Sequence, residues 1–130
     1  MNIKPSPRPL LAVTLGDPAG TGPELIARAC AEHVLADYAR LVVIGDAAVL
    51  ERAVGVTGAP LRIRTVRVIE EARFATGEVD VLDLGNVVLS QLRMGEIQEM
   101  AGEAACAYVR TAASLAIAGR VDGIVTSAIN

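Results

Sequence analysis

The sequence has very few aromatic residues: two tyrosines, one phenylalanine and no tryptophan among 130 residues. Proteins that bind single-stranded nucleic acid stack bases on exposed aromatic rings, so such a surface is not expected here. The formal net charge is −3, from 12 basic and 15 acidic residues, without a long run of either sign. Because nucleic-acid binding needs clustered basic residues that neutralise phosphates, the sequence predicts no nucleic-acid partner.

Cysteine and long apolar runs are scarce too. Cys30 and Cys106 are too few and too far apart for a disulfide framework or a zinc knuckle, and we interpret both as buried, reduced thiols. No segment approaches the ~20 apolar residues that cross a bilayer, and the N-terminus lacks the long apolar stretch of a signal peptide. The sequence therefore predicts a cytoplasmic protein with no membrane partner.

Most of the hydrophobic residues are aliphatic, and hydrophobic residues make up 52% of the sequence. The length is that of a single domain. Pro5, Pro7 and Pro9 lie in the first nine residues, so we expect residues 1–9 to form an extended, frayed leader. Residues 10–130 remain as an α/β portion.

Five segments have the pattern of strands. The near-continuous apolar runs at 10–15, 41–45 and 121–127 are typical of strands in the interior of a parallel sheet. Residues 61–68 alternate between apolar and polar, which predicts a strand nearer an edge. Residues 79–82 form a further strand candidate.

Helical spacing is found between these strands. We expect helices at 23–36, from Asp46 as N-cap to about Val54, and at 101–119. The face of the first helix expected in the core consists of Leu25, Ile26, Ala29, Cys30 and, less clearly, His33. The face of the last consists of Ala101, Ala104, Ala105, Tyr108, Ala112, Leu115, Ala116 and Gly119, of which Gly119 ends the helix.

Helices interleaved with apolar strands predict an α/β fold, a mostly parallel sheet with helices on both faces. The charged residues within and after the alternating segment, Arg62, Arg64 and Arg67 with Glu70 and Glu71, are interpreted as solvated faces.

One loop has the composition of a ligand site. Residues 16–24 read GDPAGTGPE and join the first strand to the first helix, where ligands bind in open α/β sheets. Gly16, Gly20 and Gly22 permit positive φ and close backbone approach, and a helix N-terminus suits phosphate or carboxylate. The spacing is neither G-x-G-x-x-G nor a Walker loop. A glycine turn that merely connects the two elements is the alternative.

This GDPAGTGPE loop resembles the opening signature of the 4-hydroxythreonine-4-phosphate dehydrogenase family, whose fold is similar to isocitrate and isopropylmalate dehydrogenases. Residues 124–130, IVTSAIN, resemble the family's strand-loop IVTAPINK, although Ser127-Ala128 replaces the usual Ala-Pro or Gly-Pro. Residues 45–47 and the segment from Gly95 through the long helix also fit in order and spacing. The resemblance covers essentially the whole chain and implies an incomplete, N-terminal portion of that fold.

The resemblance implies an oxidoreductase that uses NAD and, in the full-length family, a divalent metal such as Zn, Mg, Mn or Co. Its substrate is a small phosphorylated hydroxy acid, which is oxidised and then decarboxylated, and the enzyme is a homodimer. Residues 79–98 are more similar to the branch acting on 4-phospho-D-threonate or 4-phospho-D-erythronate than to the pyridoxine biosynthesis branch. The family's Gly-His-Thr segment and metal-binding histidines lie downstream of residue 130.

No catalytic or metal-binding residue is therefore assigned within this chain, and His33, its single histidine, belongs to no family motif. The cofactor- or substrate-binding candidates are Gly16, Asp17, Gly20, Thr21, Gly22, Thr126 and Asn130. Of these, Gly20, Thr21 and Gly22 are expected nearest the ligand, in a pocket lined by residues 16–24.

Two other functions stay open for the chain as it stands. It is either a stand-alone α/β module that binds a phosphorylated metabolite without catalysis, or an inactive remnant of a truncated reading frame. If the family architecture holds, the apolar stripe of the 101–119 helix or the side of the 121–127 strand should lack its covering layer. The isolated chain should then self-associate or be only marginally stable.

Overall fold

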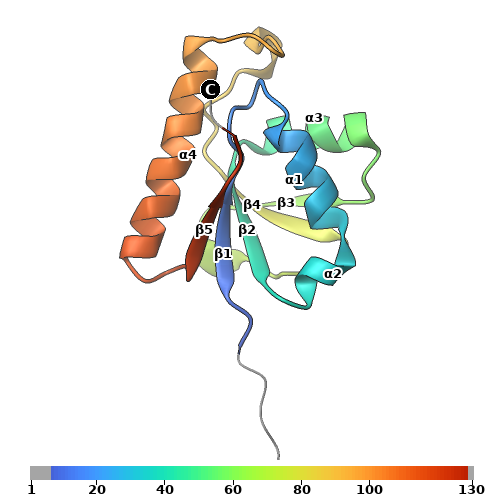
Figure 1. Ribbon diagram of the computed structural model, residues 1–130, viewed down its shortest axis with the longest axis vertical. Coiled ribbons are helices and arrows are strands. Elements are labelled where there is room, and N and C mark those ends of the chain that lie inside the picture. Colours follow the sequence, from blue (N-terminus) through green and yellow to red (C-terminus); the bar gives the residue numbers. More distant parts are fainter. Residues whose placement is uncertain (1–6, 129–130) are drawn as a thin grey trace, which may run out of the picture.

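Five parallel strands form the centre of the fold in a computed structural model that describes residues 7–128 (Figure 1). They are β1 (Leu10–Thr14), β2 (Arg40–Gly45), β3 (Arg62–Val66), β4 (Glu78–Asp83) and β5 (Gly123–Thr126). Their order in the sheet is β3-β4-β2-β1-β5, and every neighbouring pair is parallel. The structure confirms the α/β class and the parallel sheet.

Helices cover both faces of the sheet, as expected. Helices α1 (Gly22–Ala31) and α3 (Ala47–Thr57) pack together on one face, and α4 (Glu99–Ile117) packs on the other against β2, β1 and β5 (Figure 1). The short helix α2 spans His33–Ala36, and two 3₁₀ turns, η1 and η2, span Ile69–Glu71 and Leu89–Gln91. The architecture is therefore a three-layer arrangement with one long helix on one side.

The core is aliphatic because β1 and β2 lie in the middle of the sheet. Ala12, Val42 and Val43 are fully buried. The buried residues of α4 are Ala101, Ala104, Ala105, Tyr108, Ala112 and Leu115, which confirms most of the stripe expected from sequence. Ala116 is half-buried and Gly119 is exposed. Gly119 has a φ of +72° just beyond the helix, which confirms the expected glycine stop.

The edges of the sheet agree only in part with the sequence. β3 is at one edge, as its alternating pattern indicates. The expectation that the 121–127 strand lies in the interior is wrong, because β5 forms the other edge of the described sheet. Ile124 and Val125 remain 39% and 47% exposed. The apolar sequence of β5 is typical of a strand with a neighbour on each side, but within residues 7–128 β5 pairs with β1 alone.

The first predicted helix is broken in two at Glu32, whose ψ of 116° is extended. Its buried face is Gly22, Pro23, Ile26 and Ala27. Leu25, expected in the core, is 61% exposed. The buried side of the helix is centred on Ile26 and Ala27, and Leu25 and Ala29 lie on the opposite, solvent-exposed side.

The two thiols differ. Cys106 is exposed on α4, so the expectation that both are buried is wrong. Cys30 is half-buried, and burial raises its pKa to about 11, which keeps the thiol protonated and unreactive at neutral pH.

The expected leader is only partly within the described residues, since residues 1–6 lie outside them. Its last residues are held at the start of β2. The Arg40 amide donates to the Pro9 carbonyl at 2.8 Å, and the Arg40 Nε donates to the Arg8 carbonyl at 3.0 Å. Arg8 and Pro9 of the expected leader are thus bonded to the first residue of β2.

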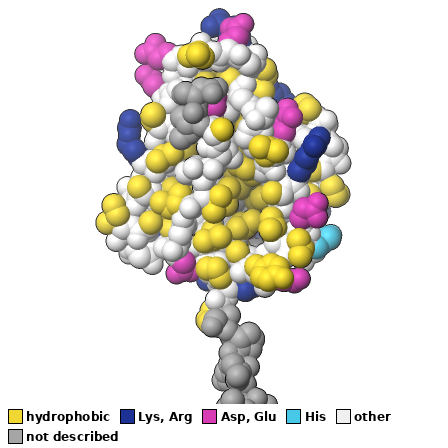
Figure 2. Space-filling model, in the orientation of Figure 1, with side chains coloured by type: hydrophobic (Ala, Val, Ile, Leu, Met, Phe, Trp, Pro, Cys, Tyr) yellow, Lys and Arg dark blue, Asp and Glu magenta, His cyan; other side chains and the backbone are white. Residues whose placement is uncertain are grey.

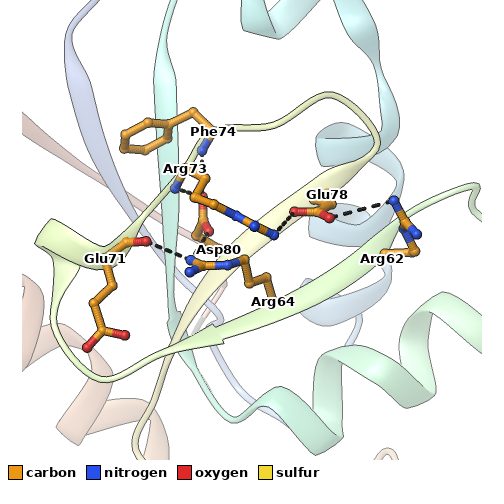
Figure 3. A network of polar contacts seen from close by, with 7 residues as sticks. All are labelled: Arg62, Arg64, Glu71, Arg73, Phe74, Glu78 and Asp80. Carbon is orange, nitrogen blue, oxygen red and sulfur yellow. Dashed lines mark hydrogen bonds and ion pairs between the residues drawn. The ribbon is translucent and has the colours of Figure 1, made fainter.

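A charged network fixes the connection between β3 and β4 (Figure 3). The Asp80 carboxylate is buried and accepts from Arg64 at 3.2 Å and from the amides of Arg73 and Phe74 at 3.1 and 2.9 Å. Arg64 also donates to the Glu71 carbonyl at 2.6 Å. The expectation that Arg64 is merely solvated is therefore wrong, because its guanidinium neutralises a buried carboxylate.

We predict that Arg64→Met lowers the free energy of unfolding by roughly 2–3 kcal/mol, because it removes the cation from a buried carboxylate. Arg62→Met is the matched control on the same strand. The Arg62 side chain is 81% exposed and its contact with Glu78 is 3.6 Å long, so its loss should cost less than about 0.5 kcal/mol. Urea unfolding of both variants measures the difference, and equal costs would contradict the role of Arg64.

Candidate functional site

The carboxyl ends of the parallel strands meet at one edge of the sheet, the upper edge in Figure 1. A segment leaves this edge after each of the five strands. Residues 15–21 follow β1, Asp46 follows β2, residues 67–77 follow β3, residues 84–98 follow β4, and residues 127–128 follow β5. Ligands of open α/β sheets bind at this edge, so it is the candidate site.

Gly16 and Gly22 are required by contacts within the chain. Gly16 has a φ of +74°, and a Cβ there would lie 2.7 Å from the Ser127 Cβ and the Ala128 carbonyl oxygen. A Cβ at Gly22 would lie 2.7 Å from the Leu15 carbonyl oxygen and 2.9 Å from the Ser127 Cβ. Both glycines thus let the segment after β5 approach the loop.

Asp17, Gly20 and Thr21 form the turn between these glycines. The Asp17 amide donates to the Ala128 carbonyl at 3.1 Å, and the buried Asp17 carboxylate accepts from the Ala19 amide at 2.8 Å. The Gly20 amide closes the turn on the Asp17 carbonyl at 3.0 Å. Thr21 is exposed at the N-cap of α1, and its side chain makes no capping hydrogen bond.

Thr126 is exposed at the end of β5 and pairs with Thr14 of β1. The structure therefore brings Gly16, Asp17 and Gly22 against residues 127–128, beside Thr126. Asn130, the remaining candidate, lies outside the described residues.

A pocket of about 180 Å³ lies beside the loop. Its lining comes from the loop and α1, from α3 and from the segment before α4: Pro18, Gly20, Pro23, Glu24, Val49, Arg52, Ala53, Val56 and Met94. Of Gly20, Thr21 and Gly22, the three residues expected nearest the ligand, Gly20 lines this pocket. Its volume is smaller than that of a site for a whole drug-sized ligand, so it suits one part of a ligand.

Three helices begin at this edge. The N-cap residues of α1, α3 and α4 are Thr21, Asp46 and Gln98, and none of these side chains caps its own helix. Helix N-termini carry free amides and a partial positive charge that favour anions. The first amide of α3 is bonded to the Asp83 carboxylate, so the N-termini of α1 and α4 are the parts of this edge that suit phosphate or carboxylate groups.

The Asp46 side chain has a different role from the N-cap that its position suggests. It is 2% exposed, and it accepts from the Val87 amide at 3.0 Å and from the hydroxyl of Tyr108. Burial, and next the Asp46 carboxylate, raise the pKa of Tyr108 well above its usual value. Asp46 thus holds the loop after β4 and α4 to the end of β2.

The segment 84–98 is fastened over the candidate site by further contacts. Asp83 accepts from the amides of Ala47 and Gly85, each at 3.2 Å. The Gly95 amide donates to the Ala19 carbonyl at 2.8 Å, which joins this segment to the glycine loop. Sequence reasoning missed this role of Asp46 and Asp83, although an aspartate at the end of each of two adjacent strands was a signal of it.

The described residues contain no metal centre. Within 7–128, no three His, Cys, Asp or Glu side chains lie close enough together to hold a metal ion. The residues of this part of the chain therefore do not fit the divalent metal that the family resemblance implies. None of the helices in this part is both long and apolar enough to cross a membrane.

Comparison with known sequences gives one consistent result. A family model described as Pyridoxal phosphate biosynthetic protein PdxA matches residues 37–130. A curated relative from Fusobacterium nucleatum, named "Putative D-threonate 4-phosphate dehydrogenase", is 40% identical over 95% of this chain. A relative of the same name from Symbiobacterium thermophilum is 41% identical over the same share. The chain spans 37% of the length of each relative.

Solved structures agree with the sequences. A 4-hydroxythreonine-4-phosphate dehydrogenase from Burkholderia phymatum is similar to this chain with a TM-score of 0.93 and 36% identity. The similarity covers 96% of this chain and 38% of that protein. The enzyme from Klebsiella pneumoniae is similar with a TM-score of 0.87 and 37% identity. That similarity covers 94% of this chain and 38% of the Klebsiella protein.

Proposed function

The chain belongs to the pyridoxal phosphate biosynthetic protein PdxA family, and from this membership we propose that it is the N-terminal part of an NAD-dependent, divalent-metal-dependent dehydrogenase. Its substrate is a phosphorylated hydroxy acid, either 4-phospho-D-threonate or erythronate, or 4-phosphooxy-threonine. The names of the relatives, D-threonate 4-phosphate and 4-hydroxythreonine-4-phosphate dehydrogenase, support this class. The complete enzyme is a cytoplasmic homodimer.

The observation that carries the proposal is the position of the glycine loop. Gly20 and Thr21 lie in the loop between β1 and α1, and Gly20 lines a pocket together with Arg52 of α3 and Met94, which precedes α4. The N-terminus of α1 has free amides and a partial positive charge that favour an anion, and Arg52 adds a positive charge to the pocket. This portion of the chain therefore holds a charged group of NAD or of the substrate.

The chemical step belongs to polypeptide beyond this chain. The substrate's secondary alcohol would give its hydride to NAD and its proton to a base, and the resulting β-keto acid would then lose CO₂. Residues 7–128 supply no set of metal ligands, so the loop binds and orients, and the ligands come from the remaining length of the family's polypeptide.

A chimera tests the proposal. Residues 1–128 are joined to the part of the Burkholderia phymatum enzyme that lies beyond the match, and NADH formation is followed with 4-phospho-D-threonate and 4-phosphooxy-threonine. We expect NADH with at least one substrate when a divalent metal is added. Gly20→Val in the chimera should lower the rate on the order of 100-fold, because it displaces the bound group, and should leave the fold intact.

Gly55→Val is the matched control and should leave the rate nearly unchanged. Gly55 lies on α3, and a Cβ added there would meet no atom of a neighbouring element within 4 Å. A folded chimera that forms no NADH with either substrate contradicts the proposed activity. Normal activity of Gly20→Val would make the loop a simple turn. Binding of a phosphorylated substrate by the 130-residue chain alone, without NADH, would favour the stand-alone module.

A further inference from the structure

A second pocket lies at the edge of the sheet opposite the glycine loop, the lower edge in Figure 1. Its volume is about 80 Å³, and it lies at the amino ends of β2 and β4, because Arg40 begins β2 and Glu78 begins β4. The end of α1, helix α2 and the segment before β4 complete its walls. All of its lining residues fall within 8–80, and β1 separates β2 from β5 in the sheet. The pocket is therefore distinct from the candidate site.

Part of the wall of this pocket is apolar. Its aliphatic side chains are Ala31, Leu35, Ala36, Ala39, Leu41 and Val79. Around α2, hydrophobic side chains lie next to acidic side chains and the histidine on the surface of the molecule (Figure 2). By volume the pocket has room for about five water molecules, or for an organic group of similar size.

Three carboxylates line the pocket, and two of them are neutralised from outside it. The Asp80 carboxylate pairs with Arg64 at 3.2 Å, and that of Glu78 pairs with Arg73 at 3.0 Å. Neither of these arginines belongs to the lining. The third carboxylate, that of Glu32, is exposed and forms no ion pair with another described residue. One negative charge of the wall is thus left without a cation.

The wall also contains two arginines, Arg8 and Arg40, which bond to neutral acceptors. Arg8 donates to the Ala36 carbonyl, and the Arg40 Nε donates to the Arg8 carbonyl at 3.0 Å. Within residues 7–128 neither arginine forms an ion pair. Arg40 is half-buried, and charged groups that leave solvent normally gain a partner of opposite charge. Two arginines against one unpaired carboxylate give the pocket a net positive charge.

Phe74 closes the pocket in a strained conformation. Its φ of +52° lies in the left-handed region, which a bulky side chain rarely adopts. Its amide donates to Asp80 at 2.9 Å, and its ring points away from this network (Figure 3). The Arg40 guanidinium lies 5.5 Å from the centroid of the ring, a cation–π contact. Strain of this kind is concentrated where a protein holds a ligand, so the ring and the guanidinium have the arrangement of a clamp.

We propose that this pocket binds a small organic anion, whose carboxylate or phosphate group pairs with Arg8 and Arg40 and whose carbon body packs against Phe74. A guanidinium forms charge-assisted, paired hydrogen bonds with either group. The volume limits the carbon body to a few atoms. Because the pocket lies at the opposite edge of the sheet from the glycine loop, its ligand is not the dehydrogenase substrate, and the proposal is independent of the proposed activity.

An NMR titration of the ¹⁵N-labelled 130-residue chain tests the proposal. The probes are sodium propanoate and sodium phosphate, added at constant ionic strength so that general charge screening does not change. The amides of Arg40, Phe74 and Ala75 should shift and saturate, with a dissociation constant on the order of 1 mM for at least one probe. Propanamide has the shape of propanoate without its charge, and it should produce no saturable shift at these amides.

Two variants separate the site from general attraction by charge. Arg40→Met should weaken binding at least about tenfold, because it removes the charge-assisted hydrogen bonds. Arg28→Met is the matched control, since Arg28 is exposed in the last turn of α1 and does not line the pocket. Phe74→Asn should also weaken binding about tenfold without lowering the midpoint of urea unfolding, because asparagine adopts the left-handed region more readily than phenylalanine.

Saturation by propanoate alone assigns the site to a carboxylate, and saturation by phosphate alone assigns it to a phosphate group. If neither probe gives a saturable shift at Arg40, Phe74 and Ala75, the proposal is wrong. It is equally wrong if Arg28→Met weakens binding as much as Arg40→Met does, since the anion would then respond to surface charge alone. Unchanged binding by a folded Phe74→Asn variant would overturn the role of the ring.

Discussion

Gly22→Val is expected to lower the free energy of unfolding by roughly 3–5 kcal/mol, a large share of the stability of a natural domain. The first added carbon would lie 2.7 Å from the Leu15 carbonyl oxygen and 2.9 Å from the Ser127 Cβ. The carbonyl belongs to the backbone that leaves β1 and cannot move without breaking the Leu15 amide contact to Ile44 at 3.0 Å. Urea unfolding followed by circular dichroism measures the loss.

Gly20→Val is the control for this prediction, because Gly20 lies on the same loop in hydrogen-bonded turn geometry. A Cβ at Gly20 would lie 3.4 Å from the Asp17 carbonyl oxygen, which is ordinary contact, and its φ is not positive. We expect it to cost less than about 1 kcal/mol. Equal losses at the two positions would mean that the approach of Ser127 does not select glycine at position 22.

Asp46→Ala is expected to cost roughly 3–5 kcal/mol, because two buried donors lose their acceptor at once. These donors are the Val87 amide and the hydroxyl of Tyr108, which is itself fully buried. Glu51→Ala, an exposed acid on α3, is the control and should change stability by less than about 0.5 kcal/mol. A small loss for Asp46→Ala would show that segment 84–98 does not depend on this contact.

The same contact predicts the response to alkaline pH. The pKa of Tyr108 is raised in the folded chain, so above the ordinary tyrosine pKa of about 10 the unfolded state loses its proton and the folded state keeps it. Stability should therefore fall by up to about 1.4 kcal/mol per pH unit above that point. Tyr108→Phe should remove the contribution of Tyr108 and leave that of Cys30, whose pKa of about 11 adds a slope of the same sign. Parallel curves for the two proteins above a pH of about 10 would contradict the assignment.

Much of the fold could be predicted from the sequence because its signals are local. Apolar runs marked the buried strands, alternation marked β3 as an edge, and the alanine stripe of α4 was confirmed. The place of β5 was wrong because an apolar run reports that a strand is suited to burial, not which neighbours it has. Leu25 was misplaced because α1 packs through its small residues Gly22, Pro23 and Ala27 together with Ile26, and not through its largest apolar side chain.

The site was predictable in place but not in detail. The glycine loop stood out by composition and order, and it lies at the carboxyl edge as expected. The sequence could not reveal that Gly16 and Gly22 face Ser127, since a glycine required by an internal contact looks the same as one required by a ligand. Asp46 was interpreted as a cap because its partners, Val87 and Tyr108, are 41 and 62 residues away along the chain.

The contact between the two ends of the chain has a consequence for synthesis. β1 is flanked by β5, the Leu10 amide donates to Asp122 across 112 residues, and the glycine loop closes on residues 127–128. Contacts between residues so far apart in the sequence slow folding, because the intervening chain loses conformational entropy before the strands can pair. On the ribosome, β1 and its loop therefore stay incomplete until β5 has left the exit tunnel. Chaperones that hold apolar strands would meet this nascent chain with one side of β1 still unpaired.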